Sequence, residues 1–319
     1  MRGFHKTDAG RRRAPGRRAA LLLAVTAWLG GCVTPPVSTT EKLQPKPEPV
    51  AVVILVSDAL AAYRQVADAL GARLERVRVY ALDGDRDKAQ QVIAQLRQSP
   101  AVPVVAIGPL AARLASQLSD RPIVFCLDFM PDDRRPAEAG MRGVHTMPPA
   151  LKQLEAWKML DPRLERVVLI TGSGNGEFTR EASAAGRRLG VQVNYIEVQS
   201  DRELLYAAKH MLSDAQGLWL APDNRVLSSQ VLREVLAYSI REGKQTLVFN
   251  PQLLDLGGLV SVEGDPDDIA ARVLEQLRAT RDVPRMLPLQ RAVIRINMEV
   301  ANQLGLAVPV AMQGGLYVY

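Results

Sequence analysis

Cysteine and histidine are scarce in this sequence of 319 residues, which contains two cysteines and three histidines. Two cysteines cannot form a disulfide framework, and neither Cys32 nor Cys126 stands in a CxxC or another metal-ligand spacing. After residue 31 only His145 and His210 remain, which are too few for a zinc cluster or a His-rich metal site. We therefore expect no metal site, no cofactor and no intramolecular disulfide.

The chain also lacks the common catalytic motifs, since GxSxG, HExxH and a paired-glutamate arrangement are all missing. The glycine-rich TGSGNG (171–176) has neither the GKS/T ending of a phosphate-binding loop nor the GxGxxG spacing, so a tight turn is favoured. His145 has no carboxylate or nucleophile near it in the sequence, and Cys126 lies in an apolar run, where a thiol behaves as a small hydrophobe. We predict that the protein is not an enzyme.

The positive charge of the chain is concentrated before residue 32. Seven basic residues and one acid, Asp8, precede that position. Removing them from the 40 Lys and Arg and the 34 Asp and Glu of the chain leaves 33 of each sign, so the remainder is neutral and shows no basic stripe. A neutral body cannot supply the phosphate contacts that dominate nucleic-acid affinity, and nucleic-acid binding is excluded.

The N-terminal residues have the order of a secretory signal, because basic RRRAPGRR (11–18) precedes apolar AALLLAVTAWLG (19–30). An apolar run of 12 residues is too short to span a bilayer, which requires about 20 residues as a helix. The sequence Leu29-Gly30-Gly31-Cys32 resembles a bacterial lipobox, in which the cysteine thiol receives a diacylglycerol. The alternative is a buried cysteine that follows an ordinary signal peptide.

Residues 33–50 contain five prolines and no apolar periodicity, which is typical of a semi-extended tether. We expect a signal peptide over 1–31, a tether over 32–50, and a body held in the cell envelope, facing the periplasm, by a lipid anchor alone. Val33 stands where an aspartate would favour retention in the inner membrane. This favours the outer membrane if the source is Gram-negative.

From residue 51 onward, apolar β-branched runs alternate with amphipathic stretches, which is the pattern of a parallel sheet built from βαβ units. The stretch 128–141 interrupts the alternation, which restarts at 166. We predict an α/β fold of two doubly wound parallel-sheet lobes with a cleft between them. The predicted boundaries are an N-terminal lobe over 51–146, a C-terminal lobe over 147–290, and a closing segment over 291–319 that can cross back between the lobes.

Short polar residues follow many of the predicted strands, and open α/β sheets bind ligands at the carboxyl ends of their strands. Pro222-Asp223-Asn224 can either contact a ligand or form an Asx turn that caps the next helix, and both readings stay open. Asp265, Asp267 and Asp268 are expected to be solvated charges near a helix N-terminus. The predicted ligand-binding residues are Ser57, Asp58, Gly108, Asp128, Ser173, Asn175, Asp223, Asn224 and Asn250.

Three segments carry a family resemblance: MRGVHTMPPALKQLEAWKMLDPRLERVVLI, LYAAKHMLSDAQGLWLAPDNRVLSS and INMEVANQLGLAVP. They resemble the substrate-binding proteins of ABC transporters, in the branch associated with aromatic amino acids. The resemblance implies a fold of the type I periplasmic-binding-protein kind and the capture of a small molecule. GSGNGEF (172–178) and Ser57-Asp58-Ala59 depart from the family's ligand loops, so the specificity for aromatic amino acids does not transfer.

Two functions remain on the sequence. The first is a lipid-anchored protein that captures a small organic molecule, with an amino acid as one candidate, for an ABC permease. The second is a lipoprotein of the same fold that no longer transports and instead binds another protein of the cell envelope. The altered ligand loops, Val33 and the aromatic content of 5% motivate the second.

Overall fold

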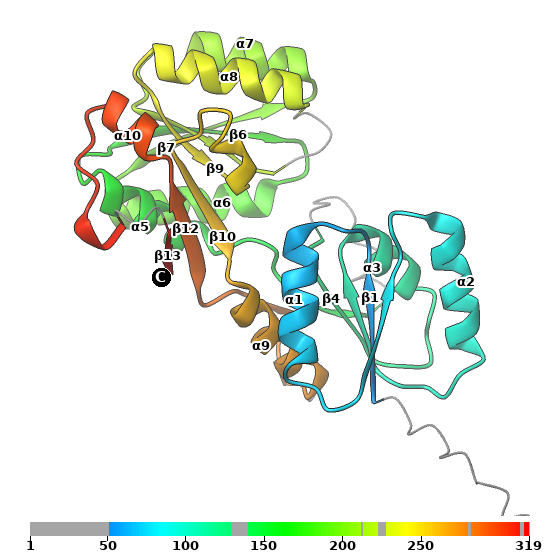
Figure 1. Cartoon of the computed structure of the whole chain (residues 1–319). Helices are drawn as coiled ribbons and strands as arrows, with labels where there is room; N and C mark the ends of the chain where they lie inside the picture. The colour runs from blue at the N-terminus through cyan, green and yellow to red at the C-terminus, as the bar shows by residue number, and fades with distance from the viewer. Residues whose placement is uncertain are drawn as a thin grey trace, which may run out of the picture. The chain divides into compact units, whose positions relative to one another are not determined.

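A computed structural model describes residues 51–128, 140–211, 213–222, 228–279, 282–312 and 316–318. These residues belong to one compact unit, Glu48–Tyr319. They form two sheets, each covered by helices on both faces (Figure 1). The predicted α/β class with two mostly parallel sheets is confirmed.

The first sheet has six parallel strands in the order β2, β1, β3, β4, β5, β11. The strand order reverses between β1 and β3, where a doubly wound sheet has its switch point. Helices α1 and α9 pack on one face and α2 and α3 on the other. The elements are β1 (Val52–Val56), α1 (Ala61–Gly71), β2 (Val77–Ala81), α2 (Arg86–Arg97), β3 (Val104–Ile107), α3 (Pro109–Ala115), β4 (Ile123–Cys126), β5 (Arg142–Val144), α9 (Pro266–Leu277) and β11 (Met286–Leu287).

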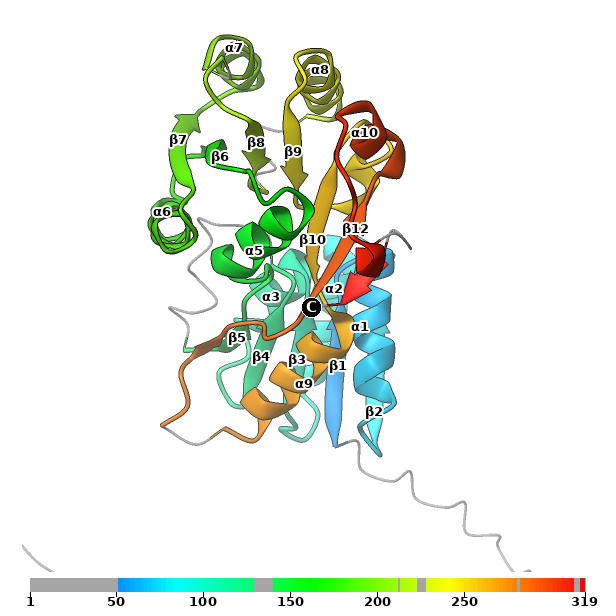
Figure 2. The ribbon, with the colours of Figure 1, turned by 90° about the vertical axis from the view of Figure 1, so that its left-hand side faces the viewer.

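The second sheet has the order β7, β6, β8, β9, β10, β12, β13, with the last two strands antiparallel to their neighbours. Figure 2 shows α7 and α8 on one face and α5 and α6 on the other. The elements are α5 (Ala150–Leu160), β6 (Arg166–Gly172), α6 (Gly176–Leu189), β7 (Gln192–Val198), α7 (Asp201–Met211), β8 (Gly217–Leu220), α8 (Ser229–Arg241), β9 (Gln245–Val248), β10 (Val260–Gly264), β12 (Ala292–Ile296), α10 (Met298–Gln303) and β13 (Leu316–Val318), with 3₁₀ turns η1 (Pro251–Leu253) and η2 (Val310–Met312).

Local sequence explains why these elements form. Strand β1 is VVILV, and all five residues are buried because helices cover both faces of the sheet. Asp85 is the N-cap of helix α2, and its carboxylate accepts hydrogen bonds from the amides of Asp87 and Lys88. Helix α1 buries Tyr63, Val66, Ala67 and Leu70, which recur at helical spacing on one side.

The chain passes between the sheets after β5, after β10 and after β11, so α9 and β11 belong to the first sheet. The sequence predicts that all of 147–290 belongs to the second lobe, whereas the structure places α9 and β11 of this range in the first lobe. The reason is long-range packing, since α9 buries Ile269 and Val273 in the same core as α1. The closing segment over 291–319 stays with the second sheet through β12 and β13.

Acidic side chains tie two of these crossings together. The Asp268 carboxylate accepts hydrogen bonds from the amides of Gln290 (2.6 Å) and Arg291 (3.0 Å). Asp265 caps α9 and pairs with the guanidinium of Arg291 at 3.1 Å. Asp265 and Asp268 are therefore buried, which corrects the expectation that they are solvated.

No helix of the described residues combines the length and the apolarity that a membrane crossing needs. The same residues contain no cluster of three or more His, Cys, Asp or Glu side chains suited to a metal ion.

Candidate functional site

Strands β1, β3 and β4 end at the same edge of the first sheet, because they are parallel and neighbouring. Ser57 and Asp58 follow β1, Gly108 follows β3, and Asp128 lies two residues after β4. The structure therefore brings the four predicted residues of this lobe to one edge, at the switch point between β1 and β3. That these residues bind a ligand stays a prediction.

Ser57 and Gly108 form the floor of this edge. The Ser57 hydroxyl oxygen accepts a hydrogen bond of 2.9 Å from the amide of Ala111 in the first turn of α3, whose N-cap is Gly108. Gly108 has a φ of 89°, and a Cβ there would lie 2.6 Å from the Ser57 oxygen and 2.8 Å from Cε2 of Tyr63. Only glycine fits this position, and Ser57 supplies the helix cap that glycine cannot.

Tyr63 of α1 lies at the centre of this edge, although its role was missed from the sequence. Burial raises the pKa of its hydroxyl far above the usual value, and the negative charges of Asp58 and Asp128 raise it further, with a smaller effect from Cys126. Both carboxylates thus lie close enough to the hydroxyl to act on it. Burial also raises the pKa of the Cys126 thiol to about 12, so the thiol stays protonated and unreactive.

Backbone geometry sets the direction of both acidic residues. The Asp58 carboxylate accepts a hydrogen bond of 2.9 Å from the amide of Leu60, which closes an Asx turn before α1. Leu127 has a φ of 54°, a region that costs a side-chain-bearing residue about 1 kcal/mol or more. The Thr146 hydroxyl donates to the carbonyl of Asp128 at 2.9 Å and fixes the chain after this turn. The strained backbone of Leu127 therefore directly precedes Asp128, one of the acidic residues at this edge.

The second sheet has a corresponding edge after β6. The Asn175 side-chain amide donates to the Thr171 hydroxyl at 2.5 Å and to the Gly172 carbonyl at 3.3 Å, which folds 171–175 into a closed loop. Asn175 is the N-cap of α6, and its side chain accepts no hydrogen bond from the first amides of this helix because it is turned back onto the loop. Ser173 lies half-buried in the loop. The tight turn predicted for the glycine-rich stretch is present, and its helix start offers backbone donors.

The remaining predicted residues divide into two groups. Asn250 follows β9, and its side-chain oxygen accepts a hydrogen bond of 2.9 Å from the amide of Gln252, so it caps η1. Cys32, Asp223 and Asn224 lie outside the described residues.

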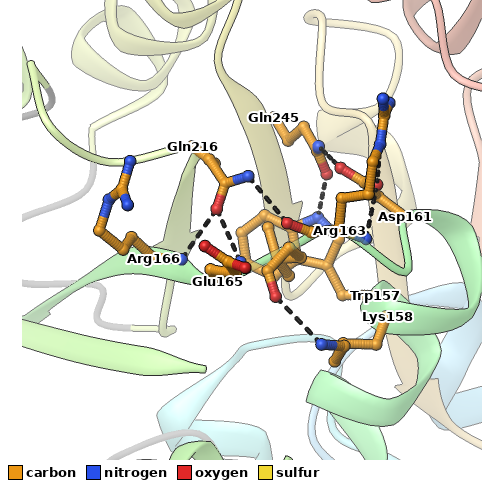
Figure 3. Close-up of polar contacts among 9 residues, drawn as sticks. Trp157, Lys158, Asp161, Arg163, Glu165, Arg166, Gln216 and Gln245 are labelled. Atoms are coloured by element: carbon orange, nitrogen blue, oxygen red, sulfur yellow. Dashed lines mark hydrogen bonds and ion pairs between the residues drawn. The ribbon is translucent and has the colours of Figure 1, made fainter. Parts of the chain in front are cut away.

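The opposite edge of the second sheet is held by a polar network (Figure 3). The Trp157 indole N–H donates to the Gln245 side-chain oxygen at 2.7 Å, and the Gln245 amide donates to the Asp161 carboxylate at 2.6 Å. The Gln216 side-chain oxygen accepts from the amides of Glu165 (2.6 Å) and Arg166 (2.9 Å). These contacts join the starts of β6, β8 and β9 to the end of α5.

A hollow of about 610 Å³ lies beside this network, but its cations already have protein partners. The Lys244 ammonium donates to the carbonyls of Ser213 (3.0 Å) and Ala215 (2.7 Å), and Arg166 Nε donates to the carbonyl of Asp214 (2.8 Å). The hollow is also at the amino edge of the sheet, away from the switch point. We therefore assign these contacts to fold stability and place the candidate site at the carboxyl edges.

Comparison with known proteins identifies the family. A family model described as ABC transporter substrate binding protein matches residues 50–271. The chain belongs to this family. Among curated protein sequences none matches the chain.

Solved structures confirm the fold of the family. The chain is similar to an ABC domain in complex with L-Trp from Streptococcus pneumonia, with 21% identity and a TM-score of 0.57 over 83% of this chain and 98% of the other. It is also similar to the ligand-free, open structure of a substrate-binding protein with adhesive properties from Clostridium difficile, with 14% identity and a TM-score of 0.64 over 81% and 96% of the two chains. At these identities the likeness shows the type I periplasmic-binding-protein fold alone.

Tyr63, Thr146 and Thr171 take part in the two edges but were not predicted. Tyr63 is one of the apolar residues that recur at helical spacing in α1, so the sequence predicts only that it is part of the core. Nothing in the sequence indicates that its hydroxyl lies at the edge of the sheet. Thr146 follows a strand of three residues, β5, and only the folded structure brings it to Asp128. Thr171 could have been found, since it stands inside the glycine-rich stretch that attracted attention.

Proposed function

We propose that this member of the family captures a small organic molecule carrying a positively charged group and an anionic group, and delivers it to an ABC permease. The observation that carries the proposal is the placement of Asp58 and Asp128 after β1 and β4, on either side of β3, at the edge where the ring of buried Tyr63 packs against Gly108. Two carboxylates beside a buried aromatic ring form a site for an ammonium group, through ion pairing and a polarised hydroxyl.

The second lobe supplies the complementary chemistry. The N-cap residue of α6, Asn175, does not cap the first amides with its side chain, which instead closes the loop that leads to them. Backbone N–H groups at the start of a helix of this length favour a carboxylate. A ligand that combines an ammonium and a carboxylate, as an amino acid does, matches both edges.

A ligand screen tests this proposal. The unit 48–319 contains all four hydrophobic cores, so we expect it to be stable without the residues that precede it. Thermal shifts are measured with amino acids, the corresponding amines that lack a carboxylate, and the corresponding acids that lack an amine. A ligand present at 100 times its Kd adds about 2.7 kcal/mol of stability. Equal shifts with amines and with amino acids would remove the role given to α6, and no shift with any compound would remove the ligand class.

We propose further that Cys32 carries the lipid anchor of the mature protein and that residues 33–50 act as the tether. The lipobox-like order of residues 29–32 after an apolar run supports this. Cys32→Ser should abolish incorporation of a palmitate analogue in growing cells and leave the protein unanchored or unprocessed. Unchanged labelling of the variant would contradict the assignment. The outer membrane as the location rests on Val33 and is tested by fractionation of labelled cells.

A second candidate, binding of a protein partner in the envelope, is favoured by one surface. Tyr195 of β7 and Tyr206 of α7 are 60% and 63% exposed. Tyr206 lines a hollow of about 380 Å³ with apolar Ile196, Val198 and Ala207 and with charged Glu197, Arg202 and Glu203. Strand β7 is also the edge strand of its sheet. Aromatic side chains of this kind are common at the centres of protein interfaces.

The two candidates separate in one pair of variants. Tyr195→Ser with Tyr206→Ser should leave the ligand-induced thermal shift unchanged under the first function. Under the second function, the double tyrosine variant should no longer form the crosslinked product with an envelope protein that the parent forms. Asp58→Asn should still form this product. Retention of the partner by the tyrosine variant would exclude this surface.

A further inference from the structure

Arginines mark the starts of several strands in the first sheet. The Arg76 carbonyl accepts hydrogen bonds from the amides of Ala51 and Val52, so Arg76 lies where β1 and β2 begin. Arg142 is the first residue of β5, and the Arg285 carbonyl accepts from the amide of Gly143 just before β11. All three arginines are therefore at the amino edge, the opposite end of the strands from Asp58 and Asp128.

Two more arginines reach this edge at helix ends. Arg97 is the last residue of α2, which runs back from the carboxyl end of β2 to the start of β3, and Arg278 is the C-cap of α9, which leads to the start of β11. A cation at a helix C-terminus is favoured by the helix dipole, and this alone explains Arg97 and Arg278. It does not explain Arg76 and Arg285, which follow no helix end directly.

The charge at this edge is not balanced locally. Three pairs are neutral: Arg73 with Asp267 at 2.7 Å, Arg121 with Asp120 at 2.8 Å and Arg272 with Glu275 at 2.7 Å. Among the other described residues of the edge, Glu75 and Asp282 are the acids. They face five arginines, which we call the arginine edge: Arg76, Arg97, Arg142, Arg278 and Arg285. The Arg142 guanidinium donates to the Gln276 side-chain oxygen (3.1 Å) and to the Val283 carbonyl (3.0 Å), so the surface charge rests on the other four.

The arginine edge is accessible. Arg76, Arg97, Arg278 and Arg285 are exposed, and Arg142 is partly exposed. Beside it, α1 and α9 border a hollow of about 520 Å³, lined by Arg73, Arg272 and Arg278 together with Glu275. Among the described residues of the first lobe, exposed arginines therefore gather at the amino edge, although the charges of the body sum to zero along the sequence.

The described chain also begins at this edge, since Ala51 directly precedes β1. Cys32 lies 19 residues earlier in the sequence, a stretch that can span at most about 65 Å when extended. If Cys32 is lipidated, the edge from which the chain enters the body is the part tethered nearest to the bilayer. A tether of this length keeps the body at a high effective concentration near the membrane.

We propose that the arginine edge binds the anionic phospholipid surface of the membrane to which the protein is tethered. An arginine near an anionic bilayer contributes a factor of roughly five in affinity, and the attraction decays over a Debye length of about 8 Å at physiological salt. Several arginines together give weak, reversible contact that adds to an acyl anchor. Docked in this way, the first lobe holds Asp58 and Asp128 at the end of its strands that is away from the bilayer.

Vesicle binding tests the proposal without the anchor. The unit 48–319 is sedimented with vesicles of phosphatidylethanolamine and phosphatidylglycerol, and separately with vesicles of phosphatidylcholine alone. We expect partition onto the anionic vesicles that falls as salt is raised, and little partition onto phosphatidylcholine. Replacing Arg76, Arg278 and Arg285 by Gln should lower the partition on the order of 100-fold.

A matched variant controls for total charge. Arg187, Arg188 and Arg233 are also exposed but lie on α6 and α8 of the second lobe, so their replacement by Gln should change the partition by less than about twofold. An equal loss in both variants, binding of the edge variant like the parent, or equal partition onto neutral vesicles would each overturn the proposal. Vesicle binding is measured on a unit that lacks Cys32, so it does not depend on the lipid anchor. Palmitate labelling at Cys32 and the ligand-induced thermal shift are measured separately, and each can fail without affecting the vesicle result.

Discussion

The two ends of the second sheet use similar residue types in different ways. At the amino edge, Gln245 bridges Trp157 and Asp161, and every one of these groups is paired inside the protein. At the carboxyl edge, Asn175 also hydrogen bonds within the chain, but its side chain closes a loop in front of α6 and does not cap the helix that follows. At one edge the side-chain amide ties strands and a helix together, and at the other it shapes the loop before a helix start.

The first sheet shows the same contrast in charge. Its carboxyl edge places Asp58 and Asp128 near the Tyr63 hydroxyl, whereas its amino edge carries the arginine edge. Position along a parallel strand, more than residue type, thus separates groups that stabilise or orient the fold from groups that can meet a ligand. Each variant below changes one end of a sheet and leaves the other as it is.

The largest effect is expected at Gly108, on which the first carboxyl edge depends. In Gly108→Ala the added Cβ would lie 2.6 Å from the Ser57 oxygen, in a backbone conformation that strains any side chain. Clash and strain together should lower the free energy of unfolding by about 4 kcal/mol. Urea denaturation of the unit 48–319 measures the loss.

Gly190→Ala is the matched control in the second lobe. Gly190 also has a positive φ, 69°, but a Cβ there would meet nothing within 4 Å. Strain alone should cost about 1 kcal/mol. Similar losses in the two variants would mean that Ser57 and Tyr63 move aside easily, and the first carboxyl edge would then not be preorganised.

The next effect is expected at the saturated amino edge. In Gln245→Leu the buried Trp157 indole N–H and the Asp161 carboxylate each lose a partner, which should cost about 3 kcal/mol of stability. Ligand affinity, measured by calorimetry below the lowered Tm, should not change, because the site is at the other end of the sheet. Gln192→Leu, an exposed position in the same lobe, should stay within about 0.5 kcal/mol of the parent. A weaker ligand in Gln245→Leu alone would remove the distinction between the two edges.

Much of this arrangement follows from local sequence. The alternation of strands and helices is predicted to begin at residue 51 and to restart at 166, and in the structure β1 begins at Val52 and β6 at Arg166. Neighbouring parallel strands end at a common edge of their sheet. The shared position of Ser57, Gly108 and Asp128 could therefore be predicted once the ends of the strands before them were predicted.

Other features depend on contacts between distant segments and leave no local signal. Strand β11 is two residues long, and its pairing with β5 depends on α9 packing beside α1. The burial of Asp268 arises from its bonds to the amides of Gln290 and Arg291, about twenty residues away. The arginine edge likewise brings together residues from three strand starts and two helix ends. Their positive charges are cancelled by acidic residues elsewhere when charges are summed along the chain, so the sum does not reveal the edge.

The carboxyl edge of the first sheet is expected to show in ligand affinity. Asp58→Asn keeps the side-chain oxygen that accepts from Leu60 but removes the negative charge. Loss of the charge-assisted bond to a ligand ammonium should weaken binding by about 10- to 100-fold, with little change in stability. Asp83→Asn, at an exposed position after β2 on the same edge, should bind like the parent. If Asp58→Asn also binds like the parent while Asn175→Ala does not, the second lobe alone recognises the ligand.

The smallest effect is a pH dependence that arises from the buried thiol beneath the same edge. Burial raises the pKa of Cys126 from 9.0 in the unfolded chain to about 12 in the fold. Above pH 9 the unfolded chain releases a proton that the folded state retains, so the stabilisation present at lower pH is lost as pH rises, by up to about 1.4 kcal/mol per pH unit until about pH 12. Between pH 8 and 10 the free energy of unfolding of the parent should therefore fall by about 1.4 kcal/mol more than that of Cys126→Ala, measured by urea denaturation at each pH.

Tyr63→Phe is the control. The pKa of Tyr63 is also raised by burial, but from an unfolded value of 10.0, so this variant should keep the loss of stability near pH 9 and reduce it only above pH 10. Identical alkaline losses in the parent and Cys126→Ala would show that water reaches the thiol, and the carboxyl edge of the first sheet would then be less closed than the amino edge of the second.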